Sequence, residues 1–185
     1  MAEADAAAAR PVLPADLRLR RNRAVALTVA FLVFVFDQAT KWVVTYPLNL
    51  PGQPQQSIKI TSFFNLHWVE NQGISLGLLS AGSEMGRWLL VGMTAIIALL
   101  VAAWLWRERR RDDSTALALI LGGALGNIVD RARFGYVVDF ADLHIGEWRP
   151  FLVFNVADAA ITIGVLLLLV RALLMRDGKA KKKEA

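Results

Sequence analysis

An uninterrupted apolar run from Trp88 to Trp106 constrains the fold more than any other feature of this sequence. Its 19 residues contain no charged side chain. About 20 apolar residues are needed for a helix to cross a hydrocarbon core of roughly 30 Å. The mean hydropathy of +0.43, with 56% hydrophobic residues, is also too high for an ordinary soluble domain. The run therefore predicts a transmembrane helix, and the chain an integral membrane protein.

Three further apolar segments complete an all-α membrane protein with four transmembrane helices. The four spans are expected at about 24–46, 87–106, 114–133 and 151–172. Together they form one domain, residues 24–175, between an N-terminal tail of residues 1–23 and a basic C-terminal tail of residues 176–185. The chain has no cysteine, which excludes disulfides, a catalytic thiol and a cysteine metal site.

The distribution of basic residues orients the four spans. Fifteen of the 21 Lys and Arg residues lie before the first span (Arg10, Arg18, Arg20, Arg21, Arg23), between the second and third (Arg107, Arg109, Arg110, Arg111), or after the last (Arg171, Arg176, Lys179, Lys181, Lys182, Lys183). The positive-inside rule then places both termini in the cytoplasm and residues 47–86 and 134–150 outside. The basic clusters that give the pI near 10.0 flank the spans and would lie against anionic lipid headgroups. No nucleic acid partner is therefore expected.

The first external segment predicts a small β-sheet. Residues Ser57–Thr61 and Phe63–Val69 are rich in alternating, β-branched and aromatic side chains. We expect this β-rich segment to rest on the membrane surface, with Trp68, Phe63 and Phe64 as interfacial anchors.

Several polar residues fall at one level of the expected topology, in the outer half of a span or just beyond it. They are Asp37, Lys41, Asn127, Asp130, Arg131, Asp139, Asn155 and Asp158. Ionisable groups in apolar surroundings are costly and need a partner or a task. Asp37 and Lys41 are four residues apart and share a helix face, so they are expected to pair. A purely structural ion pair is the alternative role for these two residues.

The third span ends in small residues followed by charged ones. Gly122, Gly123 and Gly126 allow a helix or a substrate backbone to approach closely. Arg131 lies outside against the positive-inside rule, which indicates compensation by a carboxylate or by a bound ligand. A structural pairing of Arg131 with Asp130 or Asp139 is the alternative.

Asp139 and Asp158 are the candidate catalytic pair. Asp158 is expected about two helical turns inside the last span. Two adjacent carboxylates in a low-dielectric site titrate apart, so that one holds a proton while the other ionises. This is the reagent set of an aspartic protease and requires no metal or cofactor. His67 and His144 have no partners at ligand spacing and are interpreted as ordinary polar residues.

Five blocks, in order from the first span to the last, resemble the lipoprotein signal peptidase (signal peptidase II) family. They are Asp37-Gln38-Ala39-Thr40-Lys41, Asn71-Gln72-Gly73, Gly122 to Arg131, Val138-Asp139-Phe140 and Phe154-Asn155-Val156-Ala157-Asp158. The family's two catalytic aspartates match Asp139 and Asp158. The resemblance implies that Asp37 and Lys41 hold the site, and that Asn71, Gly73, Asn127, Asp130, Arg131 and Asn155 support it around the substrate. Leu76 departs from the aromatic residue usual in the family.

The resemblance implies an intramembrane aspartic endopeptidase without cofactors. Its substrates would be diacylglyceryl-modified prolipoproteins, cleaved before the lipidated cysteine at the periplasmic face of a bacterial inner membrane. Membrane lipids are the other expected partners, and a monomer is expected. A small proton-coupled transporter using the intramembrane Asp and Arg residues is the alternative, although no inverted repeat is visible. An inactive scaffold would leave the two aspartates unexplained.

Overall fold

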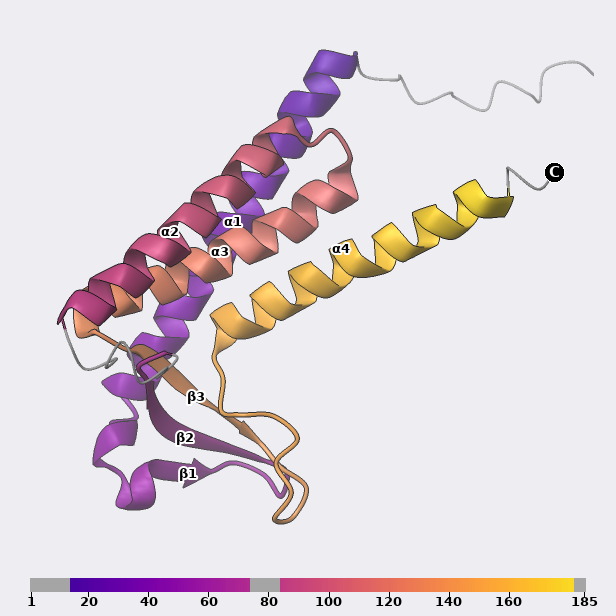
Figure 1. The fold of residues 1–185 in the computed structure, drawn as a ribbon. Helices are drawn as coiled ribbons and strands as arrows, with labels where there is room; N and C mark the ends of the chain where they lie inside the picture. Colours follow the sequence, from indigo (N-terminus) through magenta and orange to yellow (C-terminus); the bar gives the residue numbers. More distant parts are fainter. Residues whose placement is uncertain (1–13, 74–83, 182–185) are drawn as a thin grey trace, which may run out of the picture.

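Four long helices and a small sheet make up the computed structural model, which describes residues 14–73 and 84–181. The helices are α1 (Ala15–Thr45), α2 (Glu84–Arg107), α3 (Arg111–Phe134) and α4 (Val156–Lys181). All four are long and apolar enough to cross a membrane. The described part of the chain therefore confirms the predicted four-span membrane fold (Figure 1).

Helix α3 is the centre of the bundle and packs against α1, α2 and α4. Its small residues make this possible. A Cβ atom on Gly122 would lie 2.5 Å from the carbonyl oxygen of Ala30 on α1, and one on Gly123 would meet the carbonyl oxygen of Ala157 on α4. The prediction that these glycines allow close helix approach is confirmed.

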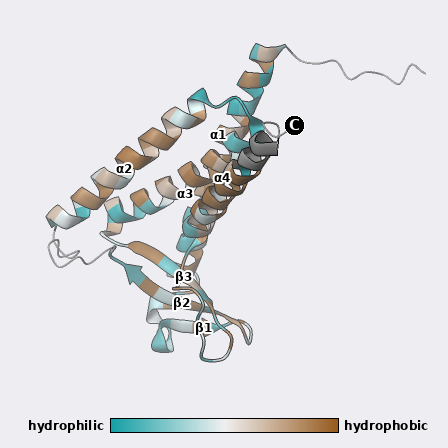
Figure 2. Cartoon of the chain, turned by 45° about the vertical axis from the view of Figure 1, so that its right-hand side comes forward, coloured by the Kyte–Doolittle hydropathy of each residue, from teal (hydrophilic) through white to brown (hydrophobic). Residues whose placement is uncertain are grey.

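The other helices expose apolar side chains outward, as lipid-facing helices do. Phe31 and Phe36 on α1, Leu99 on α2 and Leu174 on α4 are each more than 60% exposed. Figure 2 shows that hydrophobic residues predominate along α2 and α4. Such an apolar exterior is stable in lipid and not in water.

The helices differ from the expected spans mainly at their ends. Helix α1 begins at Ala15, inside the expected tail. Helix α4 begins at Val156, several residues later than the expected span of 151–172. The expectation that Asp158 lies two turns inside the helix is wrong, because Asp158 lies in the first turn. The physical reason is that Phe154 forms backbone hydrogen bonds with Phe140 and Ala141 and is therefore extended.

The external sheet has three antiparallel strands in the order β1 (Ser57–Lys59), β2 (Phe64–Asn71), β3 (Val137–Leu143). The first two strands agree with the sequence prediction, whereas β3 was expected as loop. Val69 pairs with Asp139 after an irregularity in the β2–β3 register. Trp68 is only 6% exposed and packs in the core of the sheet, so its expected role as an interfacial anchor is wrong.

The sheet lies at one end of the bundle, and the start of α1 and the far end of α4 lie at the other. The start of α1, the α2–α3 connection and the far end of α4 all lie away from the sheet, and α4 diverges from the other three helices towards that end (Figure 1). Two contacts join the helices at that end. The Arg171 guanidinium lies 2.7 Å from an oxygen of Asp112, and the Arg23 guanidinium lies 4.5 Å from the centre of the Trp106 ring.

The close packing of α3 can be tested with a matched pair of glycine substitutions. We expect Gly122→Ala to destabilise the fold by about 1–3 kcal/mol, because the added methyl group forces α1 and α3 apart. Gly92 on α2 has no atom within 4 Å of an added Cβ, so Gly92→Ala should be neutral or slightly stabilising. Thermal unfolding in detergent measures both. Equal midpoints for the two variants would contradict this packing.

Candidate active site

The Lys41 ammonium group joins the polar residues at the sheet end of the bundle. Its Nζ lies 2.9 Å from Asp37 Oδ2 and 2.8 Å from Asp130 Oδ2, and donates to Asn127 Oδ1 at 3.1 Å. The side chain is 5% exposed. Three acceptors for three N–H donors satisfy the buried cation. The predicted pairing of Asp37 with Lys41 is confirmed, and Lys41 also neutralises Asp130.

Asp37 links α1 to the start of α4. Its Oδ1 accepts a hydrogen bond from the Ala157 backbone N–H at 2.9 Å. The first N–H groups of a helix have no partner within the helix, and a carboxylate there is favourable. Gln38 strengthens the same corner by donating to Asp130 Oδ1 at 2.9 Å and to Asp37 Oδ2 at 3.2 Å. Sequence reasoning assigned no role to Gln38, although the residue lies within the first family block.

Asp130 connects the end of α3 to the strand that carries Asp139. Its Oδ2 accepts from the backbone N–H of Val138 at 3.2 Å. The connection from α3 to β3 is short because Gly135 caps the end of α3. Its φ of +87° is readily adopted only by glycine. Asp130 therefore fixes the position of β3 relative to the bundle.

Asn155 and Asp158 cap the start of α4 reciprocally. Asn155 Oδ1 accepts from the Asp158 N–H at 2.9 Å, and Asp158 Oδ2 accepts from the Asn155 N–H at 3.3 Å. This arrangement is a capping box. Asp158 Oδ1 accepts in addition from Asn127 Nδ2 at 2.8 Å. The sequence Asn-x-x-Asp at 155–158 thus explains both where the helix begins and why Asp158 is held rigidly.

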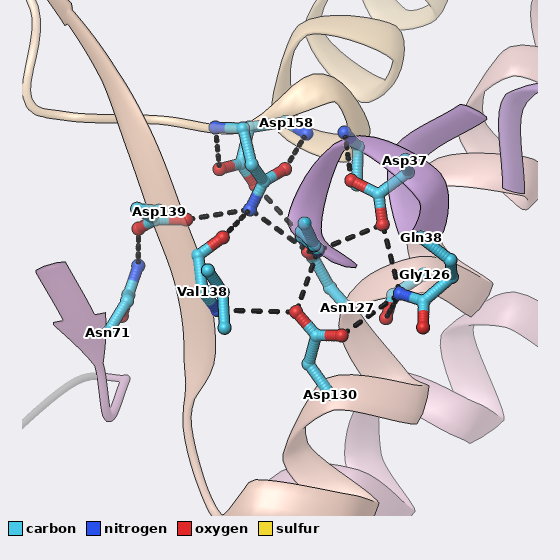
Figure 3. A network of polar contacts seen from close by, with 12 residues as sticks. Asp37, Gln38, Asn71, Gly126, Asn127, Asp130, Val138, Asp139 and Asp158 are labelled. Carbon is cyan, nitrogen blue, oxygen red and sulfur yellow. Dashed lines mark hydrogen bonds and ion pairs between the residues drawn. The ribbon is translucent and has the colours of Figure 1, made fainter. Parts of the chain in front are cut away.

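Asp139 lies on β3 and is 1% exposed. Its Oδ1 accepts from Asn155 Nδ2 at 2.6 Å and its Oδ2 accepts from Asn71 Nδ2 at 3.0 Å. Asn155 therefore bridges the Asp139 carboxylate and the Asp158 backbone. Figure 3 shows Asp139 between Asn71 and Asp158. Gly73 donates its N–H to Asn71 Oδ1 at 2.9 Å, which orients the Asn71 amide towards the carboxylate.

Burial raises the pKa of Asp139 to about 6, above the ordinary value of 3.8. The Asn71 amide opposes this effect by stabilising the ionised carboxylate, and the nearby charge of Asp158 adds to it. The environment thus favours a proton on Asp139 in mildly acidic conditions.

Arg131 is not part of the ion-pair network. Among the described residues its Nε is buried without a hydrogen-bond partner, and Asp130 pairs with Lys41. The charges of Asp158, Asp139 and Asp130 nevertheless act on its guanidinium, so the alternative role as a structural partner of Asp130 or Asp139 stays a prediction. Arg87 on α2 donates through Nε to the Arg131 carbonyl oxygen at 2.9 Å and also bonds the Ala132 carbonyl. Sequence reasoning missed Arg87, for which the sequence offered only its position at the start of a span.

An apolar hollow of about 390 Å³ borders this network. Leu143 and Leu152 line it from the sheet side, Thr162 and Ile163 line it from α4, and Asp158 is the charged residue in its lining. The hollow therefore places an apolar space next to the Asp158 carboxylate.

Leu76, which departs from the family pattern, lies outside the described residues.

The fold and the site define a multi-pass membrane protein in which buried carboxylates and amides gather where the helices meet an external sheet. The model of the family described as Signal peptidase (SPase) II matches residues 29–174. The chain is 60% identical over 159 residues to a lipoprotein signal peptidase of Sphingopyxis alaskensis, covering 86% of this chain and 90% of that protein. It is 56% identical to a lipoprotein signal peptidase of Rhizorhabdus wittichii, covering 85% and 91%.

A solved structure described as a bacterial membrane enzyme has the same fold. It superposes with a TM-score of 0.70 at 29% sequence identity, covering 84% of this chain and 92% of that one. The chain belongs to the signal peptidase II family. It is therefore a membrane-embedded protease of the signal peptidase type, and the transporter alternative is set aside.

The central ion network can be tested by removing its cation. We expect Lys41→Met to destabilise the fold by about 3–5 kcal/mol, because Asp37 and Asp130 would remain buried without their charge partner. Lys59→Met, on the exposed strand β1, serves as the control and should change stability little. Thermal unfolding in detergent compares the two variants. A Lys41→Met protein as stable as the control would contradict a structural role for this network.

Proposed function

We propose that this chain is an aspartic endopeptidase that removes the signal peptide from diacylglyceryl-modified prolipoproteins, cleaving before the lipidated cysteine. The observation that carries the proposal is the Asn155 bridge, which holds Asp139 and Asp158 as a pair. Membership in the signal peptidase II family supports the substrate class. The apolar hollow beside Asp158 supports a substrate that arrives from lipid.

In the proposed reaction Asp158 is the ionised member of the pair and Asp139 the protonated one. Asp158 takes a proton from a water molecule, which attacks the carbonyl carbon of the scissile peptide bond. Asp139 donates its proton to the carbonyl oxygen, giving a neutral tetrahedral diol. Collapse of this intermediate breaks the C–N bond while the proton on Asp158 passes to the leaving amine and the diol returns a proton to Asp139. Water is the only co-reactant.

The remaining site residues are proposed to position substrate and reagents. Arg131 offers a guanidinium whose buried Nε has no hydrogen-bond partner among the described residues, and its planar donors suit substrate carbonyl oxygens or the lipid ester. Asn71 holds Asp139 from the exposed side of the sheet. A network behind the two aspartates holds the ends of the helices and strand β3 in place. Its members are Asp37, Lys41, Asn127 and Asp130.

The proposed setting is a bacterial inner membrane with the sheet on the periplasmic face. The basic end of the bundle, with both termini, would face the cytoplasm under the positive-inside rule. Residues 24–175 would form the peptidase domain between two cytoplasmic tails. An active monomer surrounded by membrane lipids is the proposed assembly.

The catalytic pair can be tested by replacing each carboxylate with its amide. We expect Asp139→Asn and Asp158→Asn each to lower cleavage of a diacylated prolipoprotein at least about a thousandfold, because an amide cannot exchange the proton. Gel-shift processing by purified protein in lipid measures the loss.

Asp142→Asn is the matched control, because Asp142 is a buried carboxylate on the same strand whose ion-pair partner is Arg149. We expect it to stay within about threefold of the unsubstituted protein. Unfolding midpoints separate lost chemistry from lost folding, which matters most for Asp158, since it also caps α4. A folded Asp139→Asn or Asp158→Asn protein with near-normal turnover would refute the assignment.

The proton on Asp139 predicts a pH dependence of cleavage. Because its pKa is about 6, kcat/KM should fall above about pH 6 as Asp139 ionises in the free protein. The Asn71 amide lowers that pKa, so Asn71→Ala should move the falling limb to higher pH. Gln72→Ala, at the exposed neighbouring position, should leave the limb in place. A limb that stays in place or moves to lower pH in Asn71→Ala would contradict the assignment of the proton to Asp139.

A further inference from the structure

The end of the sheet far from Asn71 carries a cluster of exposed apolar side chains, of which only Phe151 and Leu152 also line the hollow beside Asp158. We call this cluster the sheet tip. Its members, with their exposed fractions, are Ile60 (52%), Phe63 (57%), Ile145 (68%), Trp148 (63%), Phe151 (62%) and Leu152 (90%). The first two come from the β1–β2 connection and the other four from the connection between β3 and α4. An apolar cluster of this kind on an external domain marks an interaction surface.

Hydrogen bonds hold the two halves of the sheet tip together. The His144 N–H donates to the Phe63 carbonyl oxygen at 3.0 Å, and Ile145 and Trp148 exchange backbone hydrogen bonds across a tight turn. Arg149 reaches back to Asp142 on β3 at 3.1 Å. The apolar side chains are thus held facing outward by a fixed backbone.

The apolar hollow places part of the sheet tip at the depth of the membrane. Phe151 and Leu152 line the hollow together with Ile163 of α4. Ile163 lies seven residues after the start of α4 at Val156, which is about 10 Å along the helix axis. Since α4 is one of the four helices apolar enough to span the membrane from Val156, side chains facing Ile163 lie beside the outer acyl chains.

The lipid-facing surface of α4 is continuous with the sheet tip. On α4, Ile163 and Leu166 are each 52% exposed. Leu152 of the sheet tip lines the same hollow as Ile163. Figure 1 shows the β3–α4 connection extending sideways from the bundle, below α4 rather than along the bundle axis. An external segment in this orientation lies along the membrane surface.

We propose that the sheet tip inserts into the outer leaflet of the bilayer. Trp148 lies at headgroup level, where aromatic residues with a polar N–H are favoured, and Phe151 and Leu152 lie among the acyl chains. The partner is the lipid bilayer itself, with no substrate required. This inference depends on the membrane fold and not on the proposed chemistry.

The absence of cysteine from the sequence allows a direct measurement of depth. Leu152→Cys introduces a single thiol for a spin label, and the protein is reconstituted into phosphatidylcholine–phosphatidylglycerol vesicles without substrate. We expect the label to be relaxed more by oxygen, which concentrates in lipid, than by a water-soluble nickel chelate. Ile145→Cys provides a second position with the same expectation. Lys59→Cys, an exposed polar position on β1, is the control and should show the reverse preference.

Two results would overturn the inference. One is a label at residue 152 as accessible to the nickel chelate as the label at residue 59, with both proteins folded by their unfolding midpoints. The other is a label at residue 152 that becomes lipid-protected only after addition of a diacylated prolipoprotein. That second result would make the sheet tip a substrate contact and not a membrane anchor. Neither result bears on the catalytic pair, which the amide substitutions test separately.

Discussion

The buried ammonium group of Lys41 is the interaction on which the rest of the site depends. It neutralises Asp37 on its own helix and Asp130 on α3, and it donates to Asn127. Each partner also contacts a different neighbouring segment. Asp37 holds the start of α4, Asp130 holds the start of β3, and Asn127 holds Asp158. A single desolvated cation thus fixes three separate segments, and its burial is tolerable because every donor is satisfied.

The site also solves a problem that any membrane helix has at its end. The first N–H groups of α4 have no partners within the helix, and an unsatisfied group there would be costly in apolar surroundings. Asn155, Asp158 and Asp37 satisfy these groups. The polar residues of the candidate site are therefore also the ones that cap the start of α4. Gly123 and Gly126 on α3 leave the space for this capped end to approach.

Sequence reasoning found the fold class and most of the members of the network, and it failed where the signal was tertiary. Long apolar runs predict transmembrane helices, and the four-residue spacing of Asp37 and Lys41 predicts an ion pair. The predicted start of the last span is wrong because the apolar residues Phe151–Phe154 resemble a span until the pairing of Phe154 with β3 is known. Trp68 looked like an interfacial aromatic residue, yet the third strand covers it. Arg87 was missed because backbone carbonyls, its partners, leave no mark in a sequence.

The two carboxylates differ in surroundings in a way that suits unequal roles. Asp158 lies at a helix N-terminus and accepts from two backbone or amide donors, an environment that stabilises negative charge. Asp139 lies on a strand, almost fully buried, and desolvation raises its pKa to about 6. Asn155 contacts both through one amide group, donating to Asp139 and accepting from the Asp158 backbone. The asymmetry that the proposed acid–base pair requires would therefore come from secondary structure, because Asp158 lies at a helix start and Asp139 on a strand. The Asn155 amide links the two residues.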